Sequence, residues 1–291
     1  MSKIIGLIRR CLAQRRHQAD IRAYIKGGRK PWSRGYKASK FDFIGTVLRD
    51  DSLIAKFQAL DVLPDNYGYG YDERVIEYPW VLSQLSERKG KVLDAGSVFN
   101  HQEIIGDPRL SYKEITIVTL APENGAFWKK GISYLYCDLR ELPFRENWFD
   151  EIVSISTLEH VGMDNRMYTG GTIYEKVGLD AKKAVRELVR VLRPGGRLLA
   201  SVGFGKHQLI EWDGHFFAEQ FDSPMLKDLL KEFEVCESVS TSFYKYTQNG
   251  WNISTEQDCQ GLEYFNIHTA GSFDSDNAAA ARAVALIEVV K

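Results

Sequence analysis

An acid and a glycine stand together at the end of an apolar run in the first half of the chain. They belong to the segment Val92-Leu93-Asp94-Ala95-Gly96-Ser97. A buried strand that ends in this way needs a tight turn, where the backbone can approach a ligand at the carboxyl end of the strand. Gly96 supplies the room, and Asp94 can accept a hydrogen bond from an ammonium group, directly or through water. The segment therefore predicts a small-molecule site at this turn.

Two later segments carry polar groups that suit chemistry at the same edge of a sheet. Tyr136-Cys137-Asp138-Leu139 follows a third apolar run, and Ser156-Thr157-Leu158-Glu159-His160-Val161 follows a fourth. Histidine titrates near neutral pH, so His160 is the natural general base for a hydroxyl nucleophile. The alternatives are that Asp138 is an ordinary turn residue and that His160 is a structural histidine bonded to the backbone.

In this order and spacing, the segments resemble class I methyltransferases that depend on S-adenosylmethionine (SAM). The family's first motif is D/E-x-G-x-G-x-G, and its three glycine positions fall here on Gly96, Val98 and Asn100. A dinucleotide site needs such glycines to place a pyrophosphate on a helix N-terminus, whereas SAM has no phosphate. The two lost glycines therefore favour SAM over NAD. Leu192-Arg193-Pro194-Gly195-Gly196 extends the resemblance, which covers residues 75–291.

The resemblance implies a set of SAM contacts along the predicted strand ends. It assigns the adenine amino group to Asp138 and the adenine ring to the backbone of Leu139. It puts Thr119 where the family carries an acid for the ribose hydroxyls, and Glu123 can replace that acid. The full set of expected cofactor residues is Asp94, Gly96, Ser97, Asn100, Thr119, Leu120, Asp138, Leu139 and Thr157.

His160 is the expected catalytic base beside the methyl donor, with His207 and His215 as further candidates. Quinone-pathway O-methyltransferases that resemble this stretch hold a divalent metal with an acid and the Glu-His pair. The position of that acid falls here on Ser156, so we expect no metal. The polar, glycine-rich loop that can shape the acceptor pocket holds Asp164, Asn165 and Tyr168.

Alternating apolar strands and helices predict an α/β fold. We expect a Rossmann-like, doubly wound, mostly parallel seven-stranded sheet with an antiparallel C-terminal strand. The expected strands are Lys91–Ala95, Ile115–Leu120, Ser133–Cys137, Phe149–Ser156, Arg197–Val202, Glu234–Tyr246 and Ala283–Val290. Asn249-Gly250 predicts a hairpin turn into Trp251-Asn252-Ile253. The expected helices are residues 3–25, Phe43–Leu60, Glu73–Leu85 with a kink or restart at Pro79, Asp180–Leu192 and Ser223–Phe233.

Charge divides the chain unevenly, although the whole chain carries a net charge of only −1. Residues 1–40 hold twelve basic residues and one acid, whereas the rest of the chain holds 26 basic and 38 acidic residues. We therefore distinguish a basic, helical N-terminal extension (1–70) from a methyltransferase domain (71–291). The extension suits an anionic partner, either a membrane surface or a phosphate-bearing substrate, or docking on its own body.

The sequence predicts a SAM-dependent O-methyltransferase acting on a small molecule or sugar. Glu77-Tyr78-Pro79-Trp80 and Asn249-Gly250-Trp251 resemble bacterial methyltransferases of surface-polysaccharide synthesis. The alternatives are a methyltransferase of nucleic acid or of lipid-linked glycan that uses the basic arm, and a non-catalytic interaction protein. Four isolated cysteines and the lack of a long apolar run predict a cytoplasmic protein, peripheral to the inner face of the membrane if the arm binds lipid.

Overall fold

The computed structural model describes residues 2–171 and 180–291, with side chains from residue 11 onward. Its α-helices are α1 (Ser2–Lys26), α2 (Tyr36–Leu48), α3 (Asp51–Ala59), α4 (Arg74–Gln84), α5 (Gln102–Ile105), α6 (Arg166–Thr169), α7 (Ala181–Val191), α8 (Ser223–Leu230) and α9 (Glu256–Cys259). Its strands are β1 (Gly90–Ala95), β2 (Lys113–Thr119), β3 (Ser133–Tyr136), β4 (Phe149–Ile155), β5 (Leu192–Gly203), β6 (Gln208–Trp212), β7 (His215–Gln220), β8 (Ser238–Thr247), β9 (Gly250–Ser254) and β10 (Ala283–Val290).

The described chain forms one large sheet with the strand order β3-β2-β1-β4-β5-β10-β8-β9. Strands β1 to β5 pair in parallel, and β10 runs antiparallel to both β5 and β8. This is the Rossmann-like, doubly wound arrangement that the sequence predicts. The expected count of seven strands is wrong, because this sheet has eight. The predicted hairpin at Asn249-Gly250 is present, and it adds β9 to the edge of the sheet.

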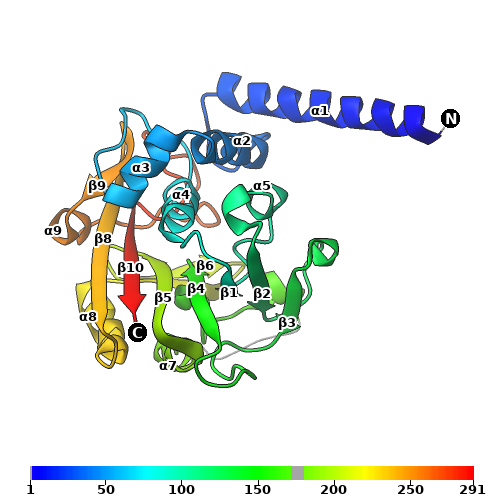
Figure 1. Cartoon of the computed structure of the whole chain (residues 1–291). Helices are drawn as coiled ribbons and strands as arrows, with labels where there is room; N and C mark the ends of the chain where they lie inside the picture. The colour runs from blue at the N-terminus through cyan, green and yellow to red at the C-terminus, as the bar shows by residue number, and fades with distance from the viewer. Residues whose placement is uncertain (1, 172–179) are drawn as a thin grey trace.

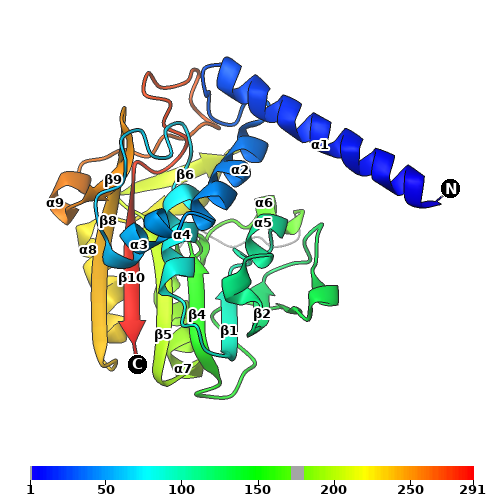
Figure 2. The same ribbon diagram turned by 45° about the horizontal axis from the view of Figure 1, so that its top comes forward.

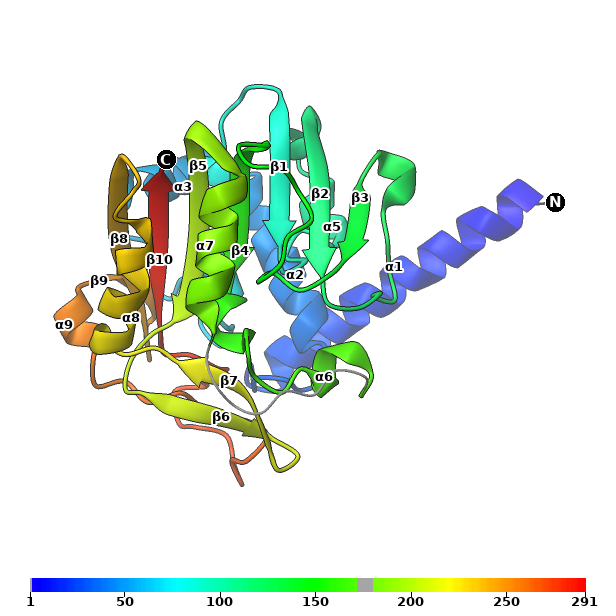
Figure 3. The ribbon, with the colours of Figure 1, turned by 90° about the horizontal axis from the view of Figure 1, so that it is seen from below.

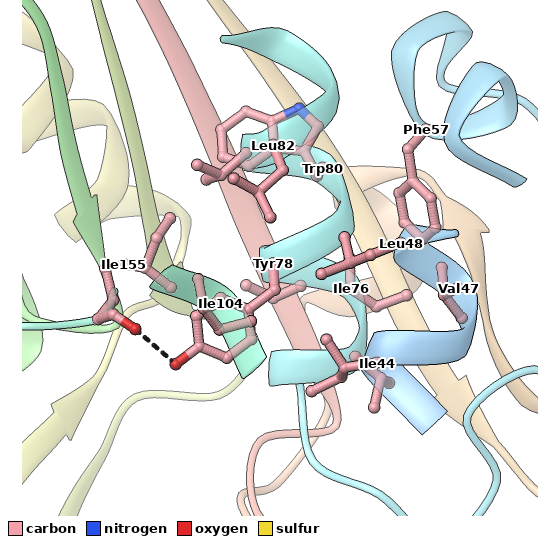
Figure 4. Close-up of a cluster of buried hydrophobic side chains, with 14 of the residues drawn as sticks. Ile44, Val47, Leu48, Phe57, Ile76, Tyr78, Trp80, Leu82, Ile104 and Ile155 are labelled. Carbon is pink, nitrogen blue, oxygen red and sulfur yellow. Dashed lines mark hydrogen bonds between the residues drawn. The ribbon is translucent and has the colours of Figure 1, made fainter. Parts of the chain in front are cut away.

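Helices cover both faces of this sheet (Figure 3). On one face, α7 and α8 pack against the strands, and α7 buries Ala184, Val185 and Leu188 at helical spacing. On the other face, α2, α3, α4 and α5 contribute to a second apolar cluster. Figure 4 shows α4 between α2 and the sheet, with Ile76 and Tyr78 buried. Both faces are therefore closed, as a parallel sheet requires.

Helix α4 runs through Pro79 without the interruption that the sequence predicts. A proline inside a helix removes the amide that would bond the carbonyl four residues earlier, here that of Val75. The hydroxyl of Tyr67 donates to this carbonyl at 2.7 Å and replaces the missing partner. The aromatic segment Tyr67–Tyr71 is a loop that packs against α4, and both Tyr67 and Tyr71 are buried.

The predicted helix Phe43–Leu60 is two helices, α2 and α3. The Asp50 carboxylate accepts hydrogen bonds from the amides of Ser52 and Leu53 and so starts a new helix. Helix α2 also begins at Tyr36, seven residues before the predicted start at Phe43.

The N-terminal extension and Tyr71, directly after it, pack on the C-terminal part of the chain. The indole of Trp251 donates to the carbonyl of Tyr71 at 3.0 Å, and the indole of Trp32 donates to that of Ala279 at 2.6 Å. Asn252 bonds both backbone groups of Leu63, at 3.0 and 3.1 Å. Residues on both sides of position 70 therefore share one core, and the domain boundary there stays a prediction.

Helix α1 projects away from the rest of the molecule (Figure 1, Figure 2). Ile21 and Tyr24 near its C-terminal end are buried, whereas Leu12 is 57% exposed and Arg15 and Arg16 face solvent. No helix in the described ranges is long and apolar enough to cross a membrane. The described part of α1 thus offers a basic surface to solvent.

Candidate functional site

A cleft of about 510 Å³ lies at the carboxyl ends of β1, β2 and β4. Parallel sheets bind ligands at this edge, because loops from several strand ends meet there. Most of the residues that the sequence predicts for the cofactor line this cleft: Gly96, Ser97, Thr119, Leu120, Asp138, Leu139 and Thr157. His160 lines it as well, and Asp94 and Asn100 do not.

The turn after β1 depends on Gly96. Its φ of 121° disfavours any residue with a side chain, and a Cβ atom there would lie 2.1 Å from Oγ1 of Thr157. Ser97 follows with a φ of 67°, and its hydroxyl is buried without a hydrogen-bond partner among the described residues. The glycine thus lets β1 and β4 approach each other, and the hydroxyl of Ser97 is available to a ligand.

Asp94 stabilises this turn without lining the cleft. Its carboxylate accepts hydrogen bonds from the amides of Val98 at 2.9 Å and Phe99 at 2.8 Å, and the residue is fully buried. Burial raises the pKa of Asp94 to about 7, although both amides favour the charged form. The geometry gives Asp94 a positioning role, and a direct contact with an ammonium group stays a prediction.

Asn100 also does not line the cleft, but it bonds residues that follow β2. Its side-chain amide donates to Glu123 at 2.7 Å and to the carbonyl of Gly125 at 2.9 Å, and its oxygen accepts from Tyr134 at 2.8 Å. Glu123 lines the cleft just beyond Thr119, where the family resemblance expects an acid for the ribose. The structure therefore places a carboxylate next to the position that Thr119 leaves without one.

Asp138 lines the cleft but is strongly engaged by Arg140. The guanidinium approaches both carboxylate oxygens, at 3.0 and 2.6 Å, and also reaches Asp180 at 3.3 Å. Burial raises the pKa of Asp138, but the hydrogen bonds and charge of Arg140 outweigh this effect and lower it overall. Asp138 is therefore an ionised acceptor that shares its oxygens with Arg140.

His160 has a fixed tautomer. Its Nδ1 lies 2.7 Å from the carbonyl of Phe217, and since a carbonyl only accepts, Nδ1 carries the hydrogen. The ring also stacks on Phe217 and meets Tyr168 edge-on. Burial lowers the pKa of His160 to about 4, so the ring is neutral at pH 7 and Nε2 keeps its lone pair. The backbone bond that the structural alternative predicts is therefore present.

The other histidine candidates lie elsewhere. His207 pairs with Glu219 at 2.5 Å, and His215 lies 3.7 Å from Asp164. Neither histidine lines the cleft or the second cavity, which is described next. Of the polar loop, Asn165 and Tyr168 reach the cleft, whereas Asp164 is held by Arg166.

A second cavity of about 380 Å³, here called the chamber, adjoins the cleft. Arg74, Ser156, His160 and Tyr168 line both. The chamber is closed by residues from α4, β7 and the segments 264–268 and 279–281. Its walls include Glu73 and Glu159.

Glu77 bonds two residues that line both cavities, Arg74 and Ser156. It accepts hydrogen bonds from the hydroxyls of Ser156 at 2.6 Å and Ser201 at 2.5 Å, and it pairs with Arg74 at 2.5 Å. Ser156, which the sequence resemblance placed at the position of a metal-binding acid, thus donates its hydroxyl hydrogen to Glu77. Within the described residues, no group of three or more His, Cys, Asp or Glu side chains could hold a metal ion.

Sequence reasoning missed the residues that the N-terminal extension and α4 bring to the cleft. Lys37, Arg74 and Tyr78 line it, yet only Tyr78 stood in a segment that the resemblance had singled out. His101, directly before α5, also lines the cleft and was missed. The hydroxyl of Tyr78 donates to the carbonyl of Val98 at 2.9 Å and so braces the turn after β1. No periodicity marks these contacts, because they depend on how the extension folds back over the sheet.

Comparison with known proteins agrees with this geometry. Residues 109–200 match the family model described as a methyltransferase domain. Over 73 residues the chain is 38% identical to a tRNA (carboxymethyluridine(34)-5-O)-methyltransferase of Arabidopsis thaliana and 33% identical to a probable tRNA methyltransferase 9B of Mus musculus. These matches cover 25% of this chain and only 15% and 13% of the relatives.

Among solved structures, the chain is similar to a 1,6-didemethyltoxoflavin-N1-methyltransferase of Burkholderia thailandensis. The TM-score is 0.42 with 16% identity, and the similarity covers 70% of this chain and 72% of the other. The family match begins at residue 109 and so excludes the turn after β1, whose glycine pattern is incomplete. It includes Asp138, His160 and most of β5.

Residues 109–200 therefore match a methyltransferase domain, the sheet is Rossmann-like, and SAM is the cofactor that this match indicates. The cleft suits that cofactor in size, since small-molecule sites span roughly 300–1,000 Å³. It also suits SAM chemically. The hydroxyl of Ser97 lacks a partner among the described residues, Glu123 lies beyond β2 and Asp138 beyond β3.

Proposed function

We propose that this protein transfers the methyl group of SAM to a hydroxyl of a small, sugar-like molecule that binds in the chamber. The observation that carries this proposal is the shared wall of the two cavities, because Arg74, Ser156, His160 and Tyr168 face both. A donor in the cleft and an acceptor in the chamber would meet at this wall. Such positioning is the main contribution of the protein to methyl transfer.

His160 is the residue that we propose to take the proton. When bound, SAM supplies a methyl group on a positively charged sulfur. The hydroxyl oxygen of the acceptor would bond to the methyl carbon while the carbon–sulfur bond breaks. The proton on that oxygen would then become strongly acidic. A base with a low pKa can accept that proton, and Nε2 of His160 carries the only lone pair on its ring.

A direct assay tests the proposal. The full chain is incubated with SAM and a panel of uncharged glycosides, and formation of S-adenosylhomocysteine (SAH) is followed. His160→Asn keeps a donor for the carbonyl of Phe217 but removes the base. We expect kcat to fall about 100-fold while SAH affinity changes less than twofold. Unchanged turnover would leave His160 with a structural role only, and failure of SAH to bind would refute the proposal itself.

A second candidate is methylation of a nucleic acid, and two observations favour it. The curated relatives that match over 73 residues are tRNA methyltransferases, and α1 presents Arg15 and Arg16 to solvent. Lysine and arginine contacts to phosphates give binding that weakens steeply with salt. The basic arm would then contact the phosphate backbone while a single nucleoside enters the chamber.

Binding of tRNA at stepped salt concentrations tests this candidate. The double substitution of Arg15 and Arg16 by Glu should remove about two phosphate contacts. The slope of log affinity against log salt concentration should then become shallower by about two. Arg88 and Lys89 are an equally exposed basic pair at the opposite edge of the sheet, before β1, and their substitution by Glu is the matched control. Equal effects of the two double variants, or no binding at low salt, would exclude the arm. Binding of the arm to anionic vesicles instead would favour a lipid-linked acceptor.

A further inference from the structure

Two carboxyl groups in the chamber each have one buried oxygen without a hydrogen-bond partner among the described residues. Glu159 is only 7% exposed, and its Oε2 is buried without a hydrogen-bond partner in the described ranges. Oε2 of Glu73 is in the same state. Buried polar groups are almost always hydrogen-bonded, so an unpartnered acid that lines a cavity points to a ligand. Here two such groups line one cavity.

The neighbouring charges do not compensate these acids. The two strong bases that line the chamber are Lys40 and Arg74. Lys40 pairs with the buried Asp72 at 2.5 Å, and Arg74 pairs with Glu77 at 2.5 Å. A phosphate or carboxylate entering the chamber would therefore face two acids and no uncommitted base among its described lining residues. The chamber thus disfavours an anionic group.

The protonation of the two acids suits hydroxyl groups. Burial raises the pKa of Glu159 to about 7, and burial together with the charges of Asp72 and Glu77 raises that of Glu73 to about 8. Near neutral pH such acids can both donate and accept hydrogen bonds, as hydroxyls do. A permanently cationic acceptor would instead bring a second positive charge next to the sulfonium.

The remaining wall is aromatic. The rings of Trp32, Tyr168, Phe217 and Tyr264 line the chamber together with the side chain of Asn266. Rings supply apolar faces for the carbon skeleton of a ligand, while a few polar groups fix its orientation. Aromatic faces beside hydrogen-bonding acids are the combination that an uncharged, hydroxyl-rich ring needs.

We propose that Glu73 and Glu159 bind hydroxyl groups of an uncharged, sugar-like acceptor and hold it against the wall shared with the cofactor cleft. This inference rests on the proposed function, because it takes the chamber to be the acceptor site. In this inference the two acids determine acceptor specificity, and His160 takes the proton. The acids are binding residues, so their loss should weaken acceptor binding more than cofactor binding.

Binding measurements on the full chain separate these roles. Methyl α-glucopyranoside is the uncharged probe, glucose 6-phosphate the anionic probe and glucosamine the cationic probe, each measured by ligand-observed NMR with and without SAH. The variants are Glu159→Gln and Glu73→Gln, which keep neutral hydrogen bonding, and Glu159→Met and Glu73→Met, which remove it at similar length. Glu237→Gln, at an exposed acid outside both cavities, is the matched control.

We expect the uncharged glycoside to bind and the phosphate not to bind. Affinity for the glycoside should fall about tenfold or more in each Met variant and less in each Gln variant, since a hydrogen bond to an acid is worth at least about tenfold. SAH affinity should stay within twofold, which also shows that the variants fold. Absence of glycoside binding at millimolar concentration, tighter binding of the anionic or cationic probe, or equal affinity in the Met variants would overturn the inference. If SAH fails to bind while the glycoside binds through these acids, the proposed function fails and the chamber assignment stands.

Discussion

The cleft and the chamber use their acids in opposite ways. In the cleft region, Asp94 accepts two backbone amides, Asp138 is held by Arg140, and Glu123 is held by Asn100. In the chamber, Glu73 and Glu159 each leave an oxygen buried without a partner in the described structure. The first set therefore builds and orients the wall, whereas the second set has bonding capacity left for a ligand.

The largest expected effect comes from breaking the turn that builds the cleft. Gly96→Ala puts a Cβ atom 2.1 Å from Oγ1 of Thr157, at a φ of 121° that a side chain tolerates poorly. Strain and overpacking should together cost about 2–6 kcal/mol of folding free energy. We expect SAH binding to be lost in isothermal titration calorimetry. Gly125→Ala in the loop after β2, where a Cβ meets nothing within 4 Å, should bind SAH normally.

The next effect concerns a paired acid. Asp94→Ala leaves the amides of Val98 and Phe99 without their acceptor, so the free energy of unfolding should fall by about 2–4 kcal/mol. Asp50→Ala also removes an acceptor of two amides, but at an exposed helix start, and should cost only about 1 kcal/mol. Urea denaturation of both variants measures the contrast. Equal losses would mean that burial of Asp94 adds nothing to its role.

The smallest expected effect is a change in how stability depends on pH. Burial raises the pKa of Glu159 from 4.5 to about 7, so the folded protein holds a proton that the unfolded chain releases between these values. The free energy of unfolding therefore falls as pH rises through that window, by up to about 3 kcal/mol from this group at 1.36 kcal/mol per pKa unit.

Glu159→Gln should flatten this decline, whereas the exposed Glu237→Gln should leave it unchanged. Urea denaturation at a series of pH values between 4.5 and 7.5 measures this fall in the free energy of unfolding. An unchanged decline in Glu159→Gln would show that the folded protein does not hold the proton on Glu159 and would remove the contrast between chamber and cleft.

The sequence predicted the parallel half of the sheet well, because each strand there is a short apolar run that a loop with polar residues ends. It predicted β10 with its observed bounds, Ala283–Val290. It missed the β6–β7 hairpin, although Asp213-Gly214 is a strong turn signal and both residues adopt positive φ, 49° and 76°. The alternation of β6 is obscured by Leu209, an exposed apolar residue next to the buried Ile210, and the hairpin packs against Met167 and Tyr264.

The cleft was predictable and the chamber was not, for a physical reason. Cleft residues follow directly after strands, so the order of the strands brings them together. Glu73 stands just before a helix, and residues 264–281 carry no motif, so only the folded chain shows that they enclose Glu159. Glu159 itself stood inside a recognised motif, but its neighbour His160 drew the functional interpretation.

The bond between Trp251 and the carbonyl of Tyr71 joins residues 180 positions apart. A ribosome adds about 5–20 residues per second, so the N-terminal helices wait roughly 10–40 s for this partner to be made. During that time the apolar sides of α2 and α4 lack the strands that later bury them. The nascent chain should therefore depend on chaperones until β8 and β9 emerge, and its folding during synthesis should finish from the C-terminal end.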